Sequence, residues 1–251
     1  MRDMLSNTSW AGRLAFWTLL PFVIPQALWV RRTAPRFADA AGPAHGAVGH
    51  GAERRLLAVG DSIIAGVGAA TLTEALVGQT AAALADKAGC RVTWRALGRT
   101  GATSSSLLER LAEILPAATF DDIIVSIGVN DVTRIETRQR FARQLERILD
   151  LLHTRYPGAR IAFAGLPPLG IFPLLPQPLR AVLGLRADTL DRVLEEVLQK
   201  SAGTVHVPVE FEFRAEAFSD DGFHPSAASY AEFGASMAEA LLCCESPATG
   251  S

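Results

Sequence analysis

From Glu53 onward, short apolar segments alternate with longer amphipathic ones, and this alternation restricts the chain to few folds. The segments Ile123–Ile127 and Ile161–Ala164 are almost continuously apolar, as parallel strands covered on both faces are. The sequence predicts strands over 55–60, 91–97, 122–128, 160–165 and 204–208 and helices over 73–88, 104–115, 134–155, 180–201 and 226–242. Such β–α repeats predict a three-layer α/β/α sandwich around a five-stranded parallel sheet.

The helix predicted over 134–155 has an apolar stripe of helical period, made of Ile135, Phe141, Leu145, Ile148, Leu149 and Leu152. It is expected to end at Tyr156, because Pro157 and Gly158 follow and neither continues a helix easily.

Size, charge and cysteine content limit the possible functions. A chain of 251 residues suits one α/β domain with a good core. Its 24 basic and 26 acidic residues leave a formal charge of −2, which does not favour a nucleic-acid partner. The cysteines, at 90, 243 and 244, have neither a disulfide pattern nor the spacing of zinc ligands, so no metal and no cofactor is expected.

Residues 14–30 form a nearly continuous apolar run without charge, followed by Arg31 and Arg32. A cleaved signal peptide is one interpretation, but the small-residue site Ala38-Asp39-Ala40 lies well beyond the run. A membrane anchor and a segment lying in the membrane interface are two others, and an apolar arm packed on the domain is a fourth. We expect uncleaved membrane association, with the domain that follows on either the cytoplasmic or the periplasmic side.

Composition also sets the expected domain boundaries. The apolar N-terminal segment covers 1–32, an Ala/Gly/Pro-rich linker covers 33–53, the α/β domain covers 54–243 and a flexible tail covers 244–251. His45 and His50 fall in the linker and are expected to be solvated there.

Ser62 follows the first predicted strand in Gly60-Asp61-Ser62, where a hydroxyl can project beyond the carboxyl end of a sheet. A serine needs a neighbouring base to act as a nucleophile. Taken alone, this tripeptide also suits a simple helix cap.

A candidate base lies near the other end of the chain, in Asp221-Gly222-Phe223-His224. Asp221 can accept a hydrogen bond from Nδ1 of His224, which leaves Nε2 for Ser62. Asp220 is expected to be a solvated neighbour, and His206, a rival base within an apolar strand, is expected to be structural.

Two further segments can supply donors to an oxyanion. Gly101 follows the second predicted strand and Asn130 follows the third, so both should reach the same sheet edge as Ser62. With the N–H of Ser62 they would form an oxyanion hole. Asp131 is expected to cap the segment after it, and Ser104 to belong to the start of the next helix.

Ser62, Gly101, Asn130 and His224, in this order, resemble the four blocks of SGNH/GDSL-type hydrolases. The resemblance covers about residues 56–242, and it implies a flavodoxin-like sandwich with esterase, lipase, thioesterase or deacetylase activity. It implies catalysis by Ser62, Asp221 and His224 and an oxyanion hole of Ser62, Gly101 and Asn130. Ala96 stands near a place where many members have an asparagine.

The segment Leu166–Leu185 is rich in proline and leucine and should overhang the active site. It is expected to form an acyl-chain pocket or a membrane-facing lid, or else simply to cover the core. The expected function is hydrolysis of small-molecule or lipid carboxylic esters through an acyl-enzyme on Ser62. An O-acyltransferase or glycan deacetylase with the same triad is the alternative, and a non-catalytic binding module is a third.

Overall fold

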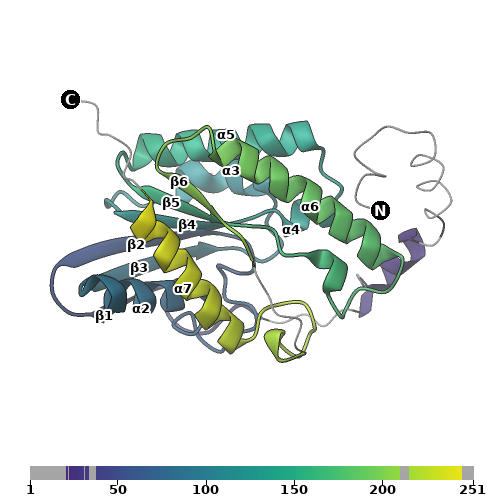
Figure 1. The fold of residues 1–251 in the computed structure, drawn as a ribbon, viewed down its shortest axis with the longest axis horizontal. Coiled ribbons are helices and arrows are strands. Elements are labelled where there is room, and N and C mark those ends of the chain that lie inside the picture. Colours follow the sequence, from purple (N-terminus) through teal and green to yellow (C-terminus); the bar gives the residue numbers. More distant parts are fainter. Residues whose placement is uncertain (1–20, 22, 31, 34–37, 210–214, 245–251) are drawn as a thin grey trace.

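The computed structural model describes residues 21, 23–30, 32–33, 38–209 and 215–244 of the chain. Its centre is a six-stranded sheet with the strand order β1-β3-β2-β4-β5-β6 (Figure 1). The strands are β1 (His45–Gly49), β2 (Glu53–Gly60), β3 (Arg91–Gly98), β4 (Asp122–Ser126), β5 (Arg160–Ala164) and β6 (Thr204–Val207). Strands β2 to β6 are parallel, and their order is that of flavodoxin-like sheets. The predicted α/β/α sandwich is therefore confirmed.

Two layers of helices cover the sheet (Figure 1). Helices α2 (Leu76–Ala88) and α7 (Ala227–Cys243) cover one face, and α3 (Ser104–Ile114), α5 (Arg138–Arg155) and α6 (Leu179–Leu198) cover the other. Side chains of β2 alternate between the two cores: Leu57 and Val59 belong to one, and Leu56 and Ala58 to the other. The continuous apolar runs in the sequence are thus explained by burial on both faces.

The sixth strand lies within the predicted linker and corrects the five-stranded prediction. β1 pairs antiparallel with β3 at the edge of the sheet, with Gly46 opposite Trp94. A Cβ on Gly46 would lie 2.4 Å from the Trp94 ring, so glycine is what allows this close pairing. The Ala/Gly-rich composition suggested flexibility, but here the small residues serve close packing. His45 and His50 are exposed, as expected.

The helix predicted over 134–155 is observed, but it begins later than expected. A short helix, α4 (Val129–Thr133), precedes α5, which begins at Arg138 after the cap residue Thr137. Between them, Ile135 has a positive φ of 59° and is 71% exposed. Ile135 is therefore not part of the buried stripe, although it stands in the right period. The other predicted apolar positions of this helix are buried.

Near the N-terminus, residues 21, 23–30 and 32–33 are helical. The side chain of Gln26 docks this helix beside the start of α6: its Nε2 donates to the carbonyl of Gln177 at 2.6 Å, and its Oε1 accepts from the N–H of Leu179 at 3.0 Å. Val23 and Val30 pack against the core. Among the residues that the structure describes, no helix is long and apolar enough to cross a membrane. The rest of the predicted apolar run, residues 14–20 and 22, lies outside the described residues.

Candidate active site

Ser62 stands at the carboxyl end of β2, where the chain turns sharply beside the end of β4. The N–H of Asp61 donates to the carbonyl of Ser126 at 3.0 Å, and Gly60 has a positive φ of 157°. A Cβ on Gly60 would come within 2.0 Å of the same carbonyl oxygen, so only glycine allows this approach. The turn after Ser62 is not a regular helix, so the capping interpretation does not describe this site.

The structure brings Ser62, His224 and Asp221 together in a continuous chain of hydrogen bonds. Nε2 of His224 lies 3.1 Å from Oγ of Ser62, and Nδ1 lies 2.6 Å from Oδ2 of Asp221. Ser62 is more than 150 positions from the other two residues in the sequence, yet the loop before α7 returns to the end of β2. This is the arrangement that a general base needs next to a hydroxyl nucleophile.

Asp221 is fixed by its own hydrogen bonds. Its Oδ1 accepts from Oγ of Ser219 at 2.9 Å and from the N–H groups of Phe223 and His224, each at 2.8 Å. Burial alone would raise the pKa of Asp221, but these hydrogen bonds and the one from the His224 ring outweigh it and lower the pKa. The carboxylate therefore stays charged beside the imidazole. Asp220, in contrast, is exposed, as expected.

The two predicted oxyanion segments lie side by side. Gly101 has a positive φ of 80° in the loop between β3 and α3, and Asn130 lies in the first turn of α4. Nδ2 of Asn130 donates to the carbonyl of Ala102 at 2.9 Å. An amide nitrogen carries two hydrogens, so the second one remains available to a ligand.

Asp61, the neighbour of the proposed nucleophile, is a buried carboxyl group that sequence reasoning did not single out. Its side chain accepts from the N–H of Ile63 at 3.2 Å and faces Oγ of Ser126 at 3.4 Å. Burial raises the pKa of Asp61 to about 7, because the nearby hydrogen bonds and His224 offset only part of the lost hydration. The residue therefore titrates near neutral pH.

An apolar cavity of about 50 Å³ adjoins Ser62 and His224. Its walls come from the ends of β4 and β5 and from the loops that follow, with Ile127, Val129, Leu166, Phe172 and Phe223 among them. Phe172 packs edge-to-face on both Phe218 and Phe223. Within the Pro/Leu-rich segment, Phe172 and Leu175 are almost completely buried, so these two side chains face the protein interior and not outward.

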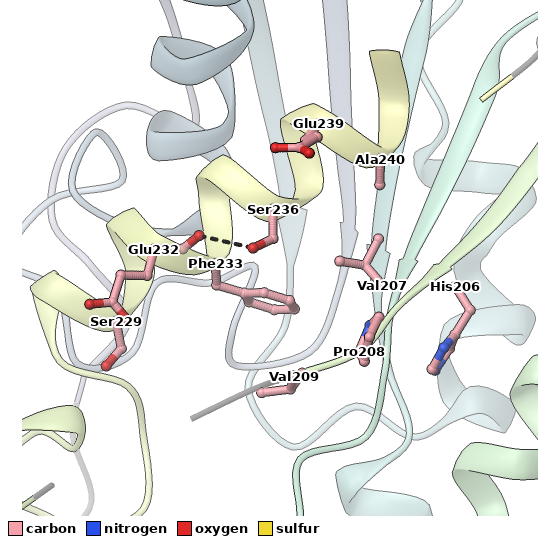
Figure 2. A pocket seen from close by; sticks show the side chains of 10 residues that line it. All are labelled: His206, Val207, Pro208, Val209, Ser229, Glu232, Phe233, Ser236, Glu239 and Ala240. Atoms are coloured by element: carbon pink, nitrogen blue, oxygen red, sulfur yellow. Dashed lines mark hydrogen bonds between the residues drawn. The ribbon is translucent and has the colours of Figure 1, made fainter. Parts of the chain in front are cut away.

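A larger cavity of about 390 Å³ lies elsewhere, between α7 and the chain at β6 (Figure 2). His206 is at its border, and Figure 2 shows its ring turned away from α7. Nε2 of His206 lies 2.9 Å from Oδ1 of Asp191, an oxygen that also accepts from the N–H of Leu166 at 2.7 Å. His206 is thus paired with Asp191 and does not contact Ser62, in agreement with its expected structural role.

Sequence reasoning assigned Asp131 the wrong partner. Asp131 does not cap the segment after it; its carboxylate accepts from the N–H and Oγ of Ser104, at the start of α3. The sequence does show the two partners, an aspartate directly after Asn130 and serines after Gly101. Their pairing could not be predicted, because the sequence does not show that these two loops are neighbours.

Comparison with known proteins identifies the family of this chain. Residues 58–232 match the model of the GDSL-like lipase/acylhydrolase family. The chain is 33% identical over 184 residues to the GDSL-like esterase Rv1075c of Mycobacterium tuberculosis; the match covers 70% of this chain and 58% of that protein.

Solved structures share the fold at low identity. The lipase/acylhydrolase from Enterococcus faecalis has a TM-score of 0.57 at 24% identity, over 77% of this chain and 98% of that one. A carbohydrate esterase family 2 enzyme from Corynascus thermopiles has a TM-score of 0.57 at 16% identity, over 75% of this chain and 65% of that one. The match to the family model, which spans more than half of the sequence, shows that this chain belongs to the GDSL-like lipase/acylhydrolase family.

Proposed function

We propose that the protein is a serine hydrolase of carboxylic esters that acts through an acyl-enzyme on Ser62. The observation that carries the proposal is the hydrogen-bonded chain from Oγ of Ser62 through His224 to Asp221. Family membership and the resemblance to a GDSL-like esterase over part of its length support it.

The proposed mechanism follows from these contacts. Oγ of Ser62 attacks the ester carbonyl carbon while Nε2 of His224 takes its proton, and Asp221 stabilises the imidazolium that forms. The N–H groups of Ser62 and Gly101 and the free hydrogen of Asn130 Nδ2 bind the oxyanion. His224 then protonates the leaving alcohol. Water, activated by the same histidine, releases the acid and restores Ser62.

The size of the cavity beside Ser62 supports a short acyl group. A volume of about 50 Å³ is only a few times the 10–15 Å³ that a single water needs. Phe172 closes the cavity and packs against two further aromatic rings, so a longer acyl chain would require movement of the Phe172 ring.

The test is hydrolysis of p-nitrophenyl esters from acetate to palmitate by the wild type and by Ser62→Ala. We expect activity on the shortest esters and a loss of about 10³-fold or more in Ser62→Ala. Ser236→Ala, which removes an exposed hydroxyl on α7, is the matched control and should retain full activity. Unchanged turnover in Ser62→Ala would refute the mechanism, and a preference for palmitate would refute the assignment of a short acyl group.

We further propose that the N-terminal helix makes peripheral contact with a membrane. Its outer face exposes Ile24, Leu28 and Trp29, and Arg32 follows on the C-terminal side. Such a helix suits the membrane interface. Sedimentation with anionic vesicles should be weakened by replacing the three apolar residues with serine while esterase activity is kept. Equal vesicle binding by both proteins would refute this proposal.

A further inference from the structure

Three side chains of the α4 region connect it to the loop that carries Gly101. Asn130 donates to the carbonyl of Ala102, Nη2 of Arg134 donates to the carbonyl of Gly101 at 3.3 Å, and Asp131 accepts from Ser104. The segments joined in this way supply Gly101 and Asn130, the two proposed oxyanion donors that lie outside the serine turn. Their relative position therefore depends on these contacts.

Of the three, the contact of Asp131 is the most deeply buried. Asp131 and Ser104 are both completely buried. Oδ2 of Asp131 accepts from the N–H of Ser104 at 3.0 Å, and Oδ1 accepts from its Oγ at 2.6 Å. A carboxylate in this position interacts with the N-terminus of α3, where negative charge is favoured.

Burying this carboxylate has a cost. Desolvation raises the pKa of Asp131, and the hydrogen bonds from Ser104 offset only part of that effect. An apolar side chain of similar size would fill the same space without the penalty. Packing alone therefore does not account for an aspartate at this position.

The contact between Asp131 and Ser104 extends to a third helix, α5. Oγ of Ser104 lies 2.6 Å from Oδ1 of Asp131 and also 2.6 Å from Oε1 of Gln144 on α5. A hydroxyl has only one hydrogen, so it cannot donate to two acceptors. Turning the Gln144 amide by 180° resolves the conflict: Nε2 then donates to Ser104, which donates to Asp131. The unit of Asp131, Ser104 and Gln144 thus links α4, α3 and α5.

We propose that Asp131 is a positioning residue of the oxyanion hole. By binding Ser104 it fixes the Gly101 loop against α4, so that the amide of Asn130 stays bonded to Ala102 with its second hydrogen directed at the oxyanion. Asp131 does not touch substrate, and it acts through Asn130. This inference rests on the oxyanion role proposed above for Asn130.

A double-mutant cycle with p-nitrophenyl acetate tests the proposal. Asn130→Ala alone should lower kcat by about 10²–10³-fold, as loss of one oxyanion donor does. Asp131→Ala alone should lower kcat by about 10²-fold, the effect of a misplacement of about 1 Å, with KM changed by less than about threefold. In the Asn130→Ala background, Asp131→Ala should lower kcat by less than about threefold, because the donor that it positions is already missing.

Three further variants separate positioning from general destabilisation. Asp122→Asn alters a buried carboxylate in β4 that binds Arg54 and Arg160, and it should lower Tm without lowering kcat. Asp131→Asn keeps an oxygen that can accept from Ser104 and should restore most of the activity. Ser104→Ala is a milder change, for use if Asp131→Ala does not fold, and should couple to Asn130→Ala in the same way.

The outcomes distinguish the two proposals. Wild-type kcat in Asn130→Ala would refute the oxyanion role itself. If Asn130→Ala loses activity while Asp131→Ala and Ser104→Ala keep full kcat, only the positioning role is refuted. It is also refuted if the loss of kcat in each double variant equals the product of the losses in the two single variants. A loss in Asp131→Asn as large as in Asp131→Ala would also refute it.

Discussion

Replacing Asp61 with asparagine should remove a large pH dependence from the stability of the protein. Asp61 is 1% exposed, and burial raises its pKa from 3.8 to about 7. In the unfolded chain the group ionises near its ordinary pKa. The folded state therefore holds a proton that the unfolded state loses, and Asp61 stabilises the fold at low pH and stops doing so as the pH rises through about 7.

The magnitude follows from the same shift. The pKa of folded Asp61, about 7, lies about two pH units above pH 5, and each of these pH units corresponds to about 1.4 kcal/mol. The wild type should thus lose about 3 kcal/mol of unfolding free energy between pH 5 and pH 8 through Asp61. Asparagine can still accept from the N–H of Ile63 but does not titrate.

The assay is urea denaturation of both proteins at pH 5 and pH 8, followed by circular dichroism. Groups that do not interact with Asp61 titrate equally in both proteins, so the difference between the two pH dependences reports Asp61 together with its coupling to His224. Asp220→Asn, which removes an exposed carboxylate two residues before Gly222, is the matched control and should behave as the wild type. Parallel pH dependences for wild type and Asp61→Asn would refute the reasoning.

Three more predictions concern the frame of the site. Gly60→Ala should prevent folding or cost more than about 3 kcal/mol, because its Cβ would meet the Ser126 carbonyl at 2.0 Å; thermal melting tests this. Asp122→Asn should cost about 3–5 kcal/mol in urea, because it removes the buried negative charge that pairs with Arg54 and Arg160; the same urea midpoint as wild type would contradict this. Phe172→Ala should cost about 3–5 kcal/mol and shift preference toward longer esters; an unchanged chain-length profile would argue against its place in the acyl cavity.

The layered fold was predictable because burial on both faces leaves a direct trace in composition. The runs 123–127 and 161–164, which overlap β4 and β5, are apolar at nearly every position, and amphipathic helices follow them. β1 has no such apolar pattern, because it is an edge strand of small and polar residues. It is held by pairing with β3 and by the close fit of Gly46 against the Trp94 ring. The later start of α5 was not predicted because Ile135 fits the helical period, although its positive φ excludes it from a right-handed helix.

The active-site candidates were accessible from sequence because each follows a strand or precedes a helix in a motif with chemical meaning. Ser62, Gly101, Asn130 and the Asp221/His224 pair were all named before any contact between them was known. The hydrogen-bonded chain from Asp221 through His224 to Ser62 was also predicted. The contacts of Asn130 with Ala102 and of Asp131 with Ser104 were not, since a motif does not specify which loops are neighbours.

The sequence by itself therefore determined the α/β architecture and the residues able to carry acyl transfer, because periodicity and residue chemistry are local properties. The tertiary structure decided the remainder. It placed Nε2 of His224 at 3.1 Å from Oγ of Ser62, closed the cavity beside Ser62 with Phe172, buried Asp61 and joined Asp131 to Ser104. Each of these depends on distances between residues far apart in the chain, which are set only when the sheet and its two helical layers pack.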